Sequence, residues 1–139
     1  MQVEDLPAVY RLGTRCYDLA DKPYNYWSVS EVADHLERHP GLCFVADDDG
    51  AVVAFALAAP SYEVLENTGH LEWLAVAPEH RRAGLAVRLI DVVVDELRAL
   101  GCQDVVADVS SENEASRLLF RRAGFDEGMS ITFFTRSLR

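Results

Sequence analysis

The chain has 139 residues, the length of one compact domain, and half of them are hydrophobic, as in a globular protein with a buried core. Its 23 acidic residues outnumber its 13 basic ones, which gives a formal net charge of −10. Because such a surface repels polyanions, we expect no nucleic acid and no membrane among its partners. The charge favours a cationic partner, and the alternative, which is common among acidic proteins, is that it serves solubility alone. No leader is visible and no apolar run approaches the roughly 18 residues of a membrane span, so we expect a cytoplasmic protein.

Neither the cysteines nor the acidic run predicts a metal site. Cys16, Cys43 and Cys102 are odd in number and form no Cys-x-x-Cys pair, which indicates reduced thiols rather than a disulfide framework or a zinc site. The run Asp47-Asp48-Asp49-Gly50 lacks the spacing of an EF-hand and is typical of a solvated turn.

The first half of the chain predicts two helices and then a hairpin. Apolar residues at near-helical spacing predict a helix over residues 5–19. Ser28 or Ser30 is expected to begin a second helix, which runs to His39 before a Pro-Gly pair. Two short apolar runs, 42–46 and 51–58, then flank an Asp-Gly pair that favours a positive-φ hairpin turn.

The second half alternates strands and helices. Strands are predicted over residues 70–76, 103–109 and 130–135. A long helix is predicted over 83–100, where Gly101 ends it. A last helix is predicted to open at the capping box Ser111-Glu112-Asn113-Glu114 and to run through Ala123. The alternation favours a single layered α/β domain.

The stretch Pro78 to Ala86 joins a predicted strand directly to a predicted helix. Gly84 and Ala86 have little bulk, and Arg81 and Arg82 add positive charge. Because a helix N-terminus presents unpaired N–H groups and the positive end of the dipole, the junction suits a phosphate or pyrophosphate. Neither a P-loop nor a Gly-x-Gly-x-x-Gly motif is present. On these residues alone, a surface loop with two solvated arginines stays equally open.

Two blocks of sequence resemble the GCN5-related N-acetyltransferase (GNAT) superfamily. LAVAPEHRRAGLAVRLI is similar to its acyl-CoA-binding motif, Gln/Arg-x-x-Gly-x-Gly/Ala after an apolar strand, which here spans Arg81 to Ala86. VVADVSSENEASRLLFRRAGF is similar to its later strand and Asn-x-x-Ala element, although Ala115 sits one place early. The resemblance implies one GNAT domain over 1–139 with an α/β (α+β mixed) fold. Its central mixed, largely antiparallel, twisted sheet would have about six strands, flanked by four helices.

The resemblance also implies acetyl-CoA (coenzyme A) as the cofactor. Backbone groups of one short segment would pair with the pantetheine arm like an added strand and polarise the thioester carbonyl; they are Leu74, Ala75 and Val76. Seven backbone N–H groups would hold the pyrophosphate, those of Arg81, Arg82, Ala83, Gly84, Leu85, Ala86 and Val87. Asn113 and Ser116 would contact the far end of the cofactor, and Phe120 would lie in the same site.

Acetylation of an amine requires a base, because an alkyl ammonium group has a pKa near ~10. His70 and Glu72 are at i and i+2 of one predicted strand and should share a face, with Leu71 and Trp73 on the opposite one. The resemblance places a base at one of these two positions, or a carboxylate at Asp108. We predict Glu72 first, then His70, then Asp108; the alternative is that each is merely a polar residue on a solvated face.

Two positions depart from the pattern of the family. Phe120 stands where members usually carry a tyrosine that protonates the departing thiolate. Because a thiol pKa is near ~8.5, the thiolate is a tolerable leaving group, and water or a tyrosine of the 24–27 loop could supply the proton. Residues 1–3 stand where members generally have a complete first strand, so we expect either a vestigial strand or a sequence that begins within it.

The resemblance implies an N-acetyltransferase that passes the acetyl group of acetyl-CoA directly to a primary amine of a small molecule or peptide, through a ternary complex. Tyr24, Tyr26 and Trp27 lie where the family builds its acceptor pocket and would either enclose a cationic amine or pack their own loop. The resemblance also allows a homodimer. The alternative is an acyl-CoA-binding module whose catalysis has lapsed, as Phe120 could indicate.

Overall fold

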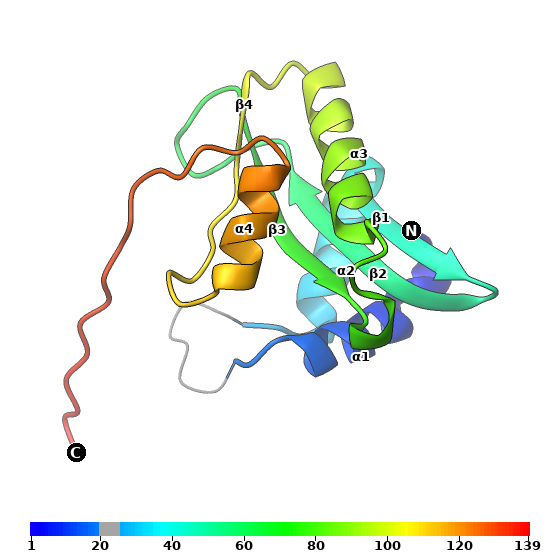
Figure 1. Cartoon of the computed structure of the whole chain (residues 1–139), viewed down its shortest axis with the longest axis horizontal. Coiled ribbons are helices and arrows are strands. Elements are labelled where there is room, and N and C mark those ends of the chain that lie inside the picture. Colours follow the sequence, from blue (N-terminus) through cyan, green and yellow to red (C-terminus); the bar gives the residue numbers. More distant parts are fainter. Residues whose placement is uncertain (20–25) are drawn as a thin grey trace. The chain divides into compact units, whose positions relative to one another are not determined.

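The computed structural model describes residues 1–19 and 26–139, in two compact units, Met1–Asp108 and Val109–Arg139. The first unit holds seven helices and strands within its described residues (Figure 1), which are α1 (Leu6–Cys16), α2 (Val29–Arg38), β1 (Cys43–Asp48), β2 (Ala51–Ala59), β3 (Thr68–Val76), α3 (Leu85–Ala99) and β4 (Asp104–Val106). The second unit holds α4 (Glu114–Arg122). No helix of the described parts is long and apolar enough to cross a bilayer.

The sheet of the first unit has the order β1-β2-β3-β4. β1, β2 and β3 pair antiparallel, and β4 pairs parallel to β3, so the mixed, largely antiparallel sheet is confirmed. The described residues form four strands, so the expectation of about six was wrong. Residues 130–135 form no strand: Ile131 and Phe134 are 69% and 93% exposed, and a strand needs an apolar face to bury.

The local signals of the first unit place its turns close to where the sequence predicts them. Asp49 and Gly50 have φ values of 53° and 86°, the conformation of a type I′ hairpin turn. The Ser28 hydroxyl accepts a hydrogen bond from the Glu31 N–H at 3.1 Å and so fixes the start of α2. Residues 3–5 form a 3₁₀ turn in front of α1.

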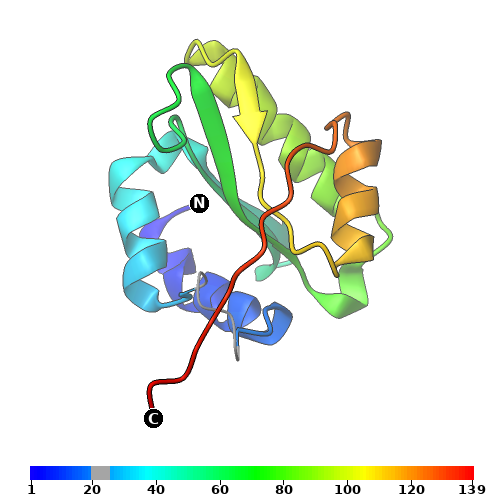
Figure 2. The ribbon, with the colours of Figure 1, turned by 90° about the vertical axis from the view of Figure 1, so that its left-hand side faces the viewer.

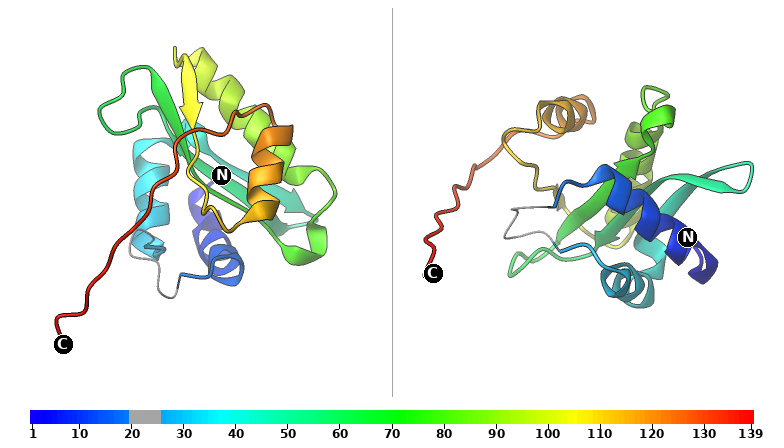
Figure 3. Two further views of the ribbon diagram at one scale, coloured as in Figure 1. Left: turned by 60° about the vertical axis from the view of Figure 1, so that its left-hand side comes forward. Right: turned by 90° about the horizontal axis from the view of Figure 1, so that it is seen from below.

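Helices cover both faces of the sheet: α1 and α2 lie on one, and α3 lies on the other (Figure 3). Phe55 and Leu57 of β2 are fully buried against the first two helices. The intervening small side chains of β2, Ala54, Ala56 and Ala58, alternate with them and lie on the α3 side. Burying each large side chain contributes about 1.5–3 kcal/mol. Because β2 is buried on both faces, it forms the centre of the core.

The ladder between β2 and β3 contains a β-bulge at Glu72. Leu57 pairs with Trp73 and Ala58 pairs with Leu71, so Glu72 is one extra residue on β3. A bulge changes the side-chain alternation at that point. Trp73 therefore joins the core cluster beneath α1 and α2, on the face that Glu72 also uses. The expectation that Trp73 points away from Glu72 was wrong for this reason.

β4 lies beside the start of β3 and extends no further (Figure 2). It pairs with Thr68, Gly69 and His70 and ends at Val106, earlier than predicted, so Asp108 follows the strand rather than belonging to it. Beyond His70, the β4-side edge of β3 has no strand partner in the described part of the chain. Free backbone groups on such an edge can pair with an extended ligand.

The second unit starts its helix differently from the predicted capping box. α4 begins at Glu114, and the side-chain oxygen of Asn113 accepts a hydrogen bond from the Ser116 N–H at 3.1 Å. Asn113 is thus the N-cap in place of Ser111, because the asparagine oxygen reaches the free N–H groups of the first turn. Gly124, with a φ of 88°, follows the end of the helix.

Candidate active site

Two histidine–carboxylate pairs lie along one face of β3. The Nε2 atom of His70 is 2.8 Å from Oδ1 of Asp108, and the His70 ring packs edge-on against Tyr62. The Glu72 Oε2 atom is 2.8 Å from Nε2 of His35. The charges of His70 and Asp108 also act on the Glu72 carboxylate, so the structure brings the three predicted candidates together.

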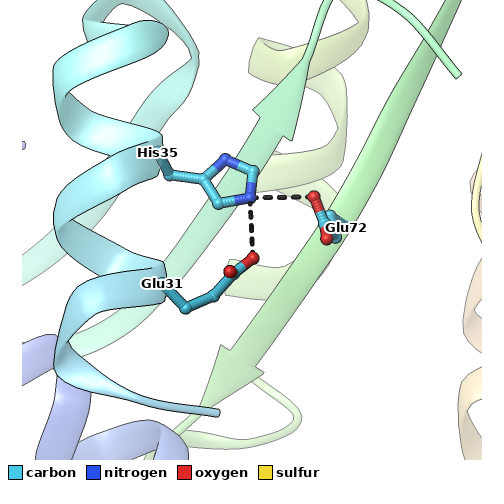
Figure 4. A group of neighbouring side chains, drawn as sticks. All are labelled: Glu31, His35 and Glu72. Carbon is cyan, nitrogen blue, oxygen red and sulfur yellow. Dashed lines mark hydrogen bonds and ion pairs between the residues drawn. The ribbon is translucent and has the colours of Figure 1, made fainter. Parts of the chain in front are cut away.

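His35 and Glu31, both on α2, complete this group and were not predicted. His35 Nε2 is 3.5 Å from Oε1 of Glu31, and that oxygen also accepts a hydrogen bond from Trp73 Nε1 at 3.3 Å. Figure 4 shows the imidazole directed between the two glutamates. The i, i+4 spacing of Glu31 and His35 is visible in the sequence, but Glu72 is 37 residues further on, and nothing local connects them.

Hydrogen bonding keeps the carboxylates of this face ionised. The bond from His35 lowers the pKa of Glu72, although burial opposes the change. Burial lowers the pKa of His35, but its hydrogen bond to Glu72 and the charges of Glu72 and Glu31 outweigh burial and raise it. The bond from His70 lowers the pKa of Asp108. At neutral pH the face is therefore negative and attracts cations.

The two described aromatic residues before α2 differ in their surroundings. Tyr26 is 67% exposed, and the negative charges of Glu31 and then Glu72 raise its pKa, so its phenol lies within the field of the acidic group. Trp27 instead packs inward: its Nε1 donates to the Tyr10 carbonyl at 3.0 Å. Tyr24 lies outside the described residues.

Packing accounts for the position of Trp27. Its ring stacks on Phe55 with centroids 5.5 Å apart and lies 4.9 Å from the ring of Trp73. A Cβ atom on Gly13 would sit 2.3 Å from the indole, so only glycine leaves room for it in α1. Of Tyr26 and Trp27, the two predicted aromatic residues that the structure describes, Tyr26 is the one left open to a ligand beside the acidic group.

The junction after β3 has a left-handed backbone turn that leads into the N-terminus of α3. Arg82 and Gly84 have φ values of 66° and 78°, and such left-handed residues in a turn direct successive N–H groups to one side. Gly84 is the N-cap of α3 and offers no side-chain cap to the N–H groups of the first turn. The helix begins at Leu85 rather than at Ala83, because the loop keeps its left-handed turn up to Gly84.

The residues of this junction fit a pyrophosphate. A Cβ atom on Gly84 would meet nothing within 4 Å, so the space beside the loop is open. The first turn of α3 contains no acidic residue that would repel an anion. Arg81 is turned toward the strand, where its Nε donates to the Val76 carbonyl at 3.2 Å. The Cys16 thiol, which was not predicted, approaches the same carbonyl at 3.6 Å.

A buried tyrosine near the open edge of β3 was also missed. The Tyr17 hydroxyl has no well-formed hydrogen bond among the described residues. Burial raises the pKa of Tyr17, and the Leu74 backbone lies beside the hydroxyl. The sequence around Tyr17 gives no sign that its hydroxyl lies beside Leu74, because only the packing of α1 on β3 brings the two together.

The cofactor residues predicted in the second unit have structural contacts of their own. Asn113 and Ser116 share the capping hydrogen bond of α4. The Phe120 ring packs edge-on against Phe125, with centroids 5.2 Å apart. The Asn113 side-chain amide nitrogen and the Ser116 hydroxyl form no hydrogen bond within the described residues and stay available to a ligand.

Comparison with known proteins identifies the family of the chain. The chain matches the acetyltransferase (GNAT) family model over residues 6–125. It is 28% identical to an aminoglycoside N(6′)-acetyltransferase type 1 of Acinetobacter haemolyticus over 123 residues, 81% of this chain and 85% of that protein. It is 29% identical over 128 residues to the ribosomal protein bS18-alanine N-acetyltransferase of Escherichia coli, 91% of this chain and 78% of that protein.

The fold agrees with the family match. A solved aminoglycoside N-acetyltransferase in complex with CoA superposes with a TM-score of 0.78 and 25% identity, covering 98% of this chain and 91% of that one. A match over most of the sequence, together with this fold, is decisive. The chain belongs to the acetyltransferase (GNAT) family.

Proposed function

We propose that residues 1–139 act as one domain that transfers the acetyl group of acetyl-CoA directly to a cationic primary amine, in a ternary complex. Membership of the family makes the chain an acetyl-CoA-dependent N-acetyltransferase, and the proposal concerns its route and its acceptor. The observation that supports it is that β3 carries a negative side-chain cluster from its start to its centre and is followed by an open loop with left-handed backbone.

The loop at the start of α3 would hold the pyrophosphate of acetyl-CoA. Arg82 and Gly84 supply the left-handed backbone, and the N–H groups from Leu85 to Val87 supply hydrogen bonds without a competing acid. The unpaired edge of β3 over Leu74 to Val76 would pair with the pantetheine arm. When bound, acetyl-CoA supplies an acetyl group activated as a thioester.

The negative face of β3 would bind the acceptor. Glu31, Glu72 and Asp108 present three carboxylates there, and Tyr26 offers an exposed aromatic ring next to two of them. An ammonium group gains from both the charge and the ring. The relatives act on aminoglycosides and on an alanine of a ribosomal protein, and of these a polycationic aminoglycoside suits a chain of net charge −10 better.

Glu72 would be the principal base, through a water molecule, with His70 beside it. The bulge directs the Glu72 carboxylate onto the acceptor face, and 30% of the side chain is exposed to an incoming ligand. His35 fixes one of its oxygens, so the other is held in a defined direction. Because its pKa is lowered, Glu72 binds an ammonium well and takes a proton less readily, and His70, oriented by Asp108, would share that task.

The experiment is an amine screen with acetyl-CoA, in which release of the CoA thiol is followed colorimetrically. The panel contains an aminoglycoside such as neamine, a peptide beginning with alanine, a lysine peptide and a polyamine. We expect the highest kcat/KM with the aminoglycoside and a KM that rises with ionic strength, because screening weakens the acidic face. A preference for the alanine peptide would overturn the acceptor class. CoA binding without turnover on any amine would instead support a lapsed module.

A further inference from the structure

Three metal-ligating atoms from two separate elements converge in the first unit. Oε1 of Glu31, Nε2 of His35 and Oε2 of Glu72 all lie within 4.8 Å of one another. Figure 4 shows both glutamate side chains directed at the same ring nitrogen, with Glu31 and His35 from α2 and Glu72 from β3. The other described histidine–carboxylate pairs, at His70 and His80, do not belong to a group of three.

A single proton on Nε2 of His35 cannot form good hydrogen bonds to both glutamates. His35 Nε2 is 2.8 Å from Glu72 and 3.5 Å from Glu31, so one hydrogen atom faces two carboxylates and bonds well to one. The second ring nitrogen of His35 is buried and has no well-formed hydrogen bond among the described residues. A cation between the three atoms would neutralise both carboxylates at once.

The distances suit a small transition-metal ion. Donors at about 2.1 Å from a tetrahedral Zn²⁺ lie about 3.4 Å from one another. The separation of Glu31 and His35, 3.5 Å, already has this value, and the 2.8 Å hydrogen bond between His35 and Glu72 needs a small opening. One imidazole with two carboxylates is a set that favours zinc and its neighbours over calcium or magnesium, which prefer oxygen alone.

Burial gives the cluster a closed side and an open one. The side chains of His35 and Glu31 are 7% and 13% exposed, so two donors are shielded from bulk water. Glu72, at 30%, borders solvent and leaves room for an entering ion and for a water as the fourth ligand. α2 fixes the first two donors four residues apart, on consecutive turns of one helix face.

We propose that Glu31, His35 and Glu72 bind a divalent transition-metal cation, for which Zn²⁺ is the probe, and that the bound ion inhibits acetyl transfer by occupying the Glu72 carboxylate. The inhibition rests on the proposed role of Glu72 as the base, whereas the binding site does not depend on it. Binding requires His35 to give up its proton on Nε2 to solvent, so each ion bound releases up to one proton.

The binding test is calorimetric titration of the metal-free protein with ZnCl₂ at neutral pH. We expect one equivalent to bind, with the affinity at least tenfold weaker in Glu31→Gln and in His35→Gln, two near-isosteric changes whose folding is checked by circular dichroism. His80→Gln, at the exposed pair with Asp48, is the matched control and should bind as the wild type does. Cys16→Ser and Cys102→Ser guard against binding at thiols. Wild-type affinity in both cluster variants, or loss with the thiols, would overturn the site.

The inhibition test measures the acetylation rate against Zn²⁺ concentration, with reversal by a chelator. Glu31→Gln keeps Glu72, and its inhibition constant, relative to its own metal-free rate, should rise at least tenfold. Calorimetric binding without inhibition would overturn the inhibitory half of the proposal and would also count against Glu72 as the base. Absence of binding would overturn the metal site and leave the proposed function standing.

Discussion

The two ends of β3 carry different kinds of site. From its start to its centre, which we call the side-chain end, β3 presents His70 and Glu72, each 2.8 Å from its partner, and we propose that they act through these side chains. After its end, the loop to α3 offers backbone N–H groups shaped by two left-handed residues, Arg82 and Gly84. The side chains are held by His35 of α2 and by Asp108, whereas the loop residues from Arg81 to Gly84 are exposed.

The difference teaches which substitutions each end tolerates. A side-chain site loses its chemistry when one carboxylate becomes an amide of the same shape, while its backbone is unchanged. A backbone site is indifferent to most side chains and depends on φ, so the residue that matters there is the one without a Cβ. Variants at one end should therefore change kcat, and variants at the other should change cofactor affinity.

The largest effect is expected at the side-chain end. Glu72→Gln keeps the volume of the side chain but cannot accept the proton, so kcat should fall about 10²- to 10⁴-fold. Calorimetry should find the CoA affinity unchanged. Glu66→Gln, an exposed residue just before β3, is the control and should behave as the wild type. If Glu72→Gln retains its kcat and His70→Gln loses it, the imidazole is the base.

The backbone end should respond through affinity. Gly84→Val places a β-branched residue at a φ of 78° and a side chain where the pyrophosphate would lie, so CoA should bind at least about tenfold more weakly. Gly101→Val at the other end of α3 has a φ of 93° and equally open surroundings, and both changes should cost about 1–2 kcal/mol of stability. Equal CoA affinity in the two variants would contradict the loop assignment.

The His35–Glu72 pair should make stability depend on pH in a defined window. The pKa of Glu72 is lowered from 4.5, so its contribution is present above that value and is lost as pH falls through the folded pKa. The pKa of His35 is raised from 6.5, so its contribution is present below that value and is lost as pH rises through the folded pKa.

The Tm difference between wild type and His35→Gln should therefore be greatest between pH 4.5 and 6.5 and shrink on both sides. A charge-assisted hydrogen bond of about 1.5–3 kcal/mol corresponds to several degrees in Tm. The scans are run with a chelator present. His80→Gln removes an exposed pair and should leave Tm nearly level with wild type at each pH. A constant difference for His35→Gln across pH 4–9 would refute the coupling.

The smallest effect is expected at Phe120. Phe120→Tyr adds a hydroxyl where the family usually carries one, and the acetylation rate should rise or change by less than about tenfold, because a thiolate leaves without much help. Stopped-flow measurement of thiol release tests this. A collapse of activity would show that the packing of Phe120 on Phe125 shapes the site.

Local signals predicted most of the fold, and long-range pairing accounts for the rest. The Asp49–Gly50 turn and the Gly84 junction were foreseen because their chemistry lies within a few residues. The bulge was not foreseen, because Leu71, Glu72 and Trp73 read as an ordinary apolar–polar–apolar alternation, in which an extra residue cannot be recognised. His35 was missed because α2 meets β3 only in the folded chain. Residues 130–135 have strand composition, but composition alone does not decide whether a segment joins a sheet.

Because of the bulge, the residue proposed for catalysis, Glu72, is not one of the residues that pair β3 with β2. Were Glu72 deleted, Leu71 and Trp73 would stay opposite Ala58 and Leu57, and the strand would run in an unbroken ladder with every apolar residue on its present face. The shortened chain should keep its sheet, lose the stability that the His35–Glu72 bond contributes, and catalyse nothing through this position. The Glu72 carboxylate therefore stands on a position that the ladder itself does not need.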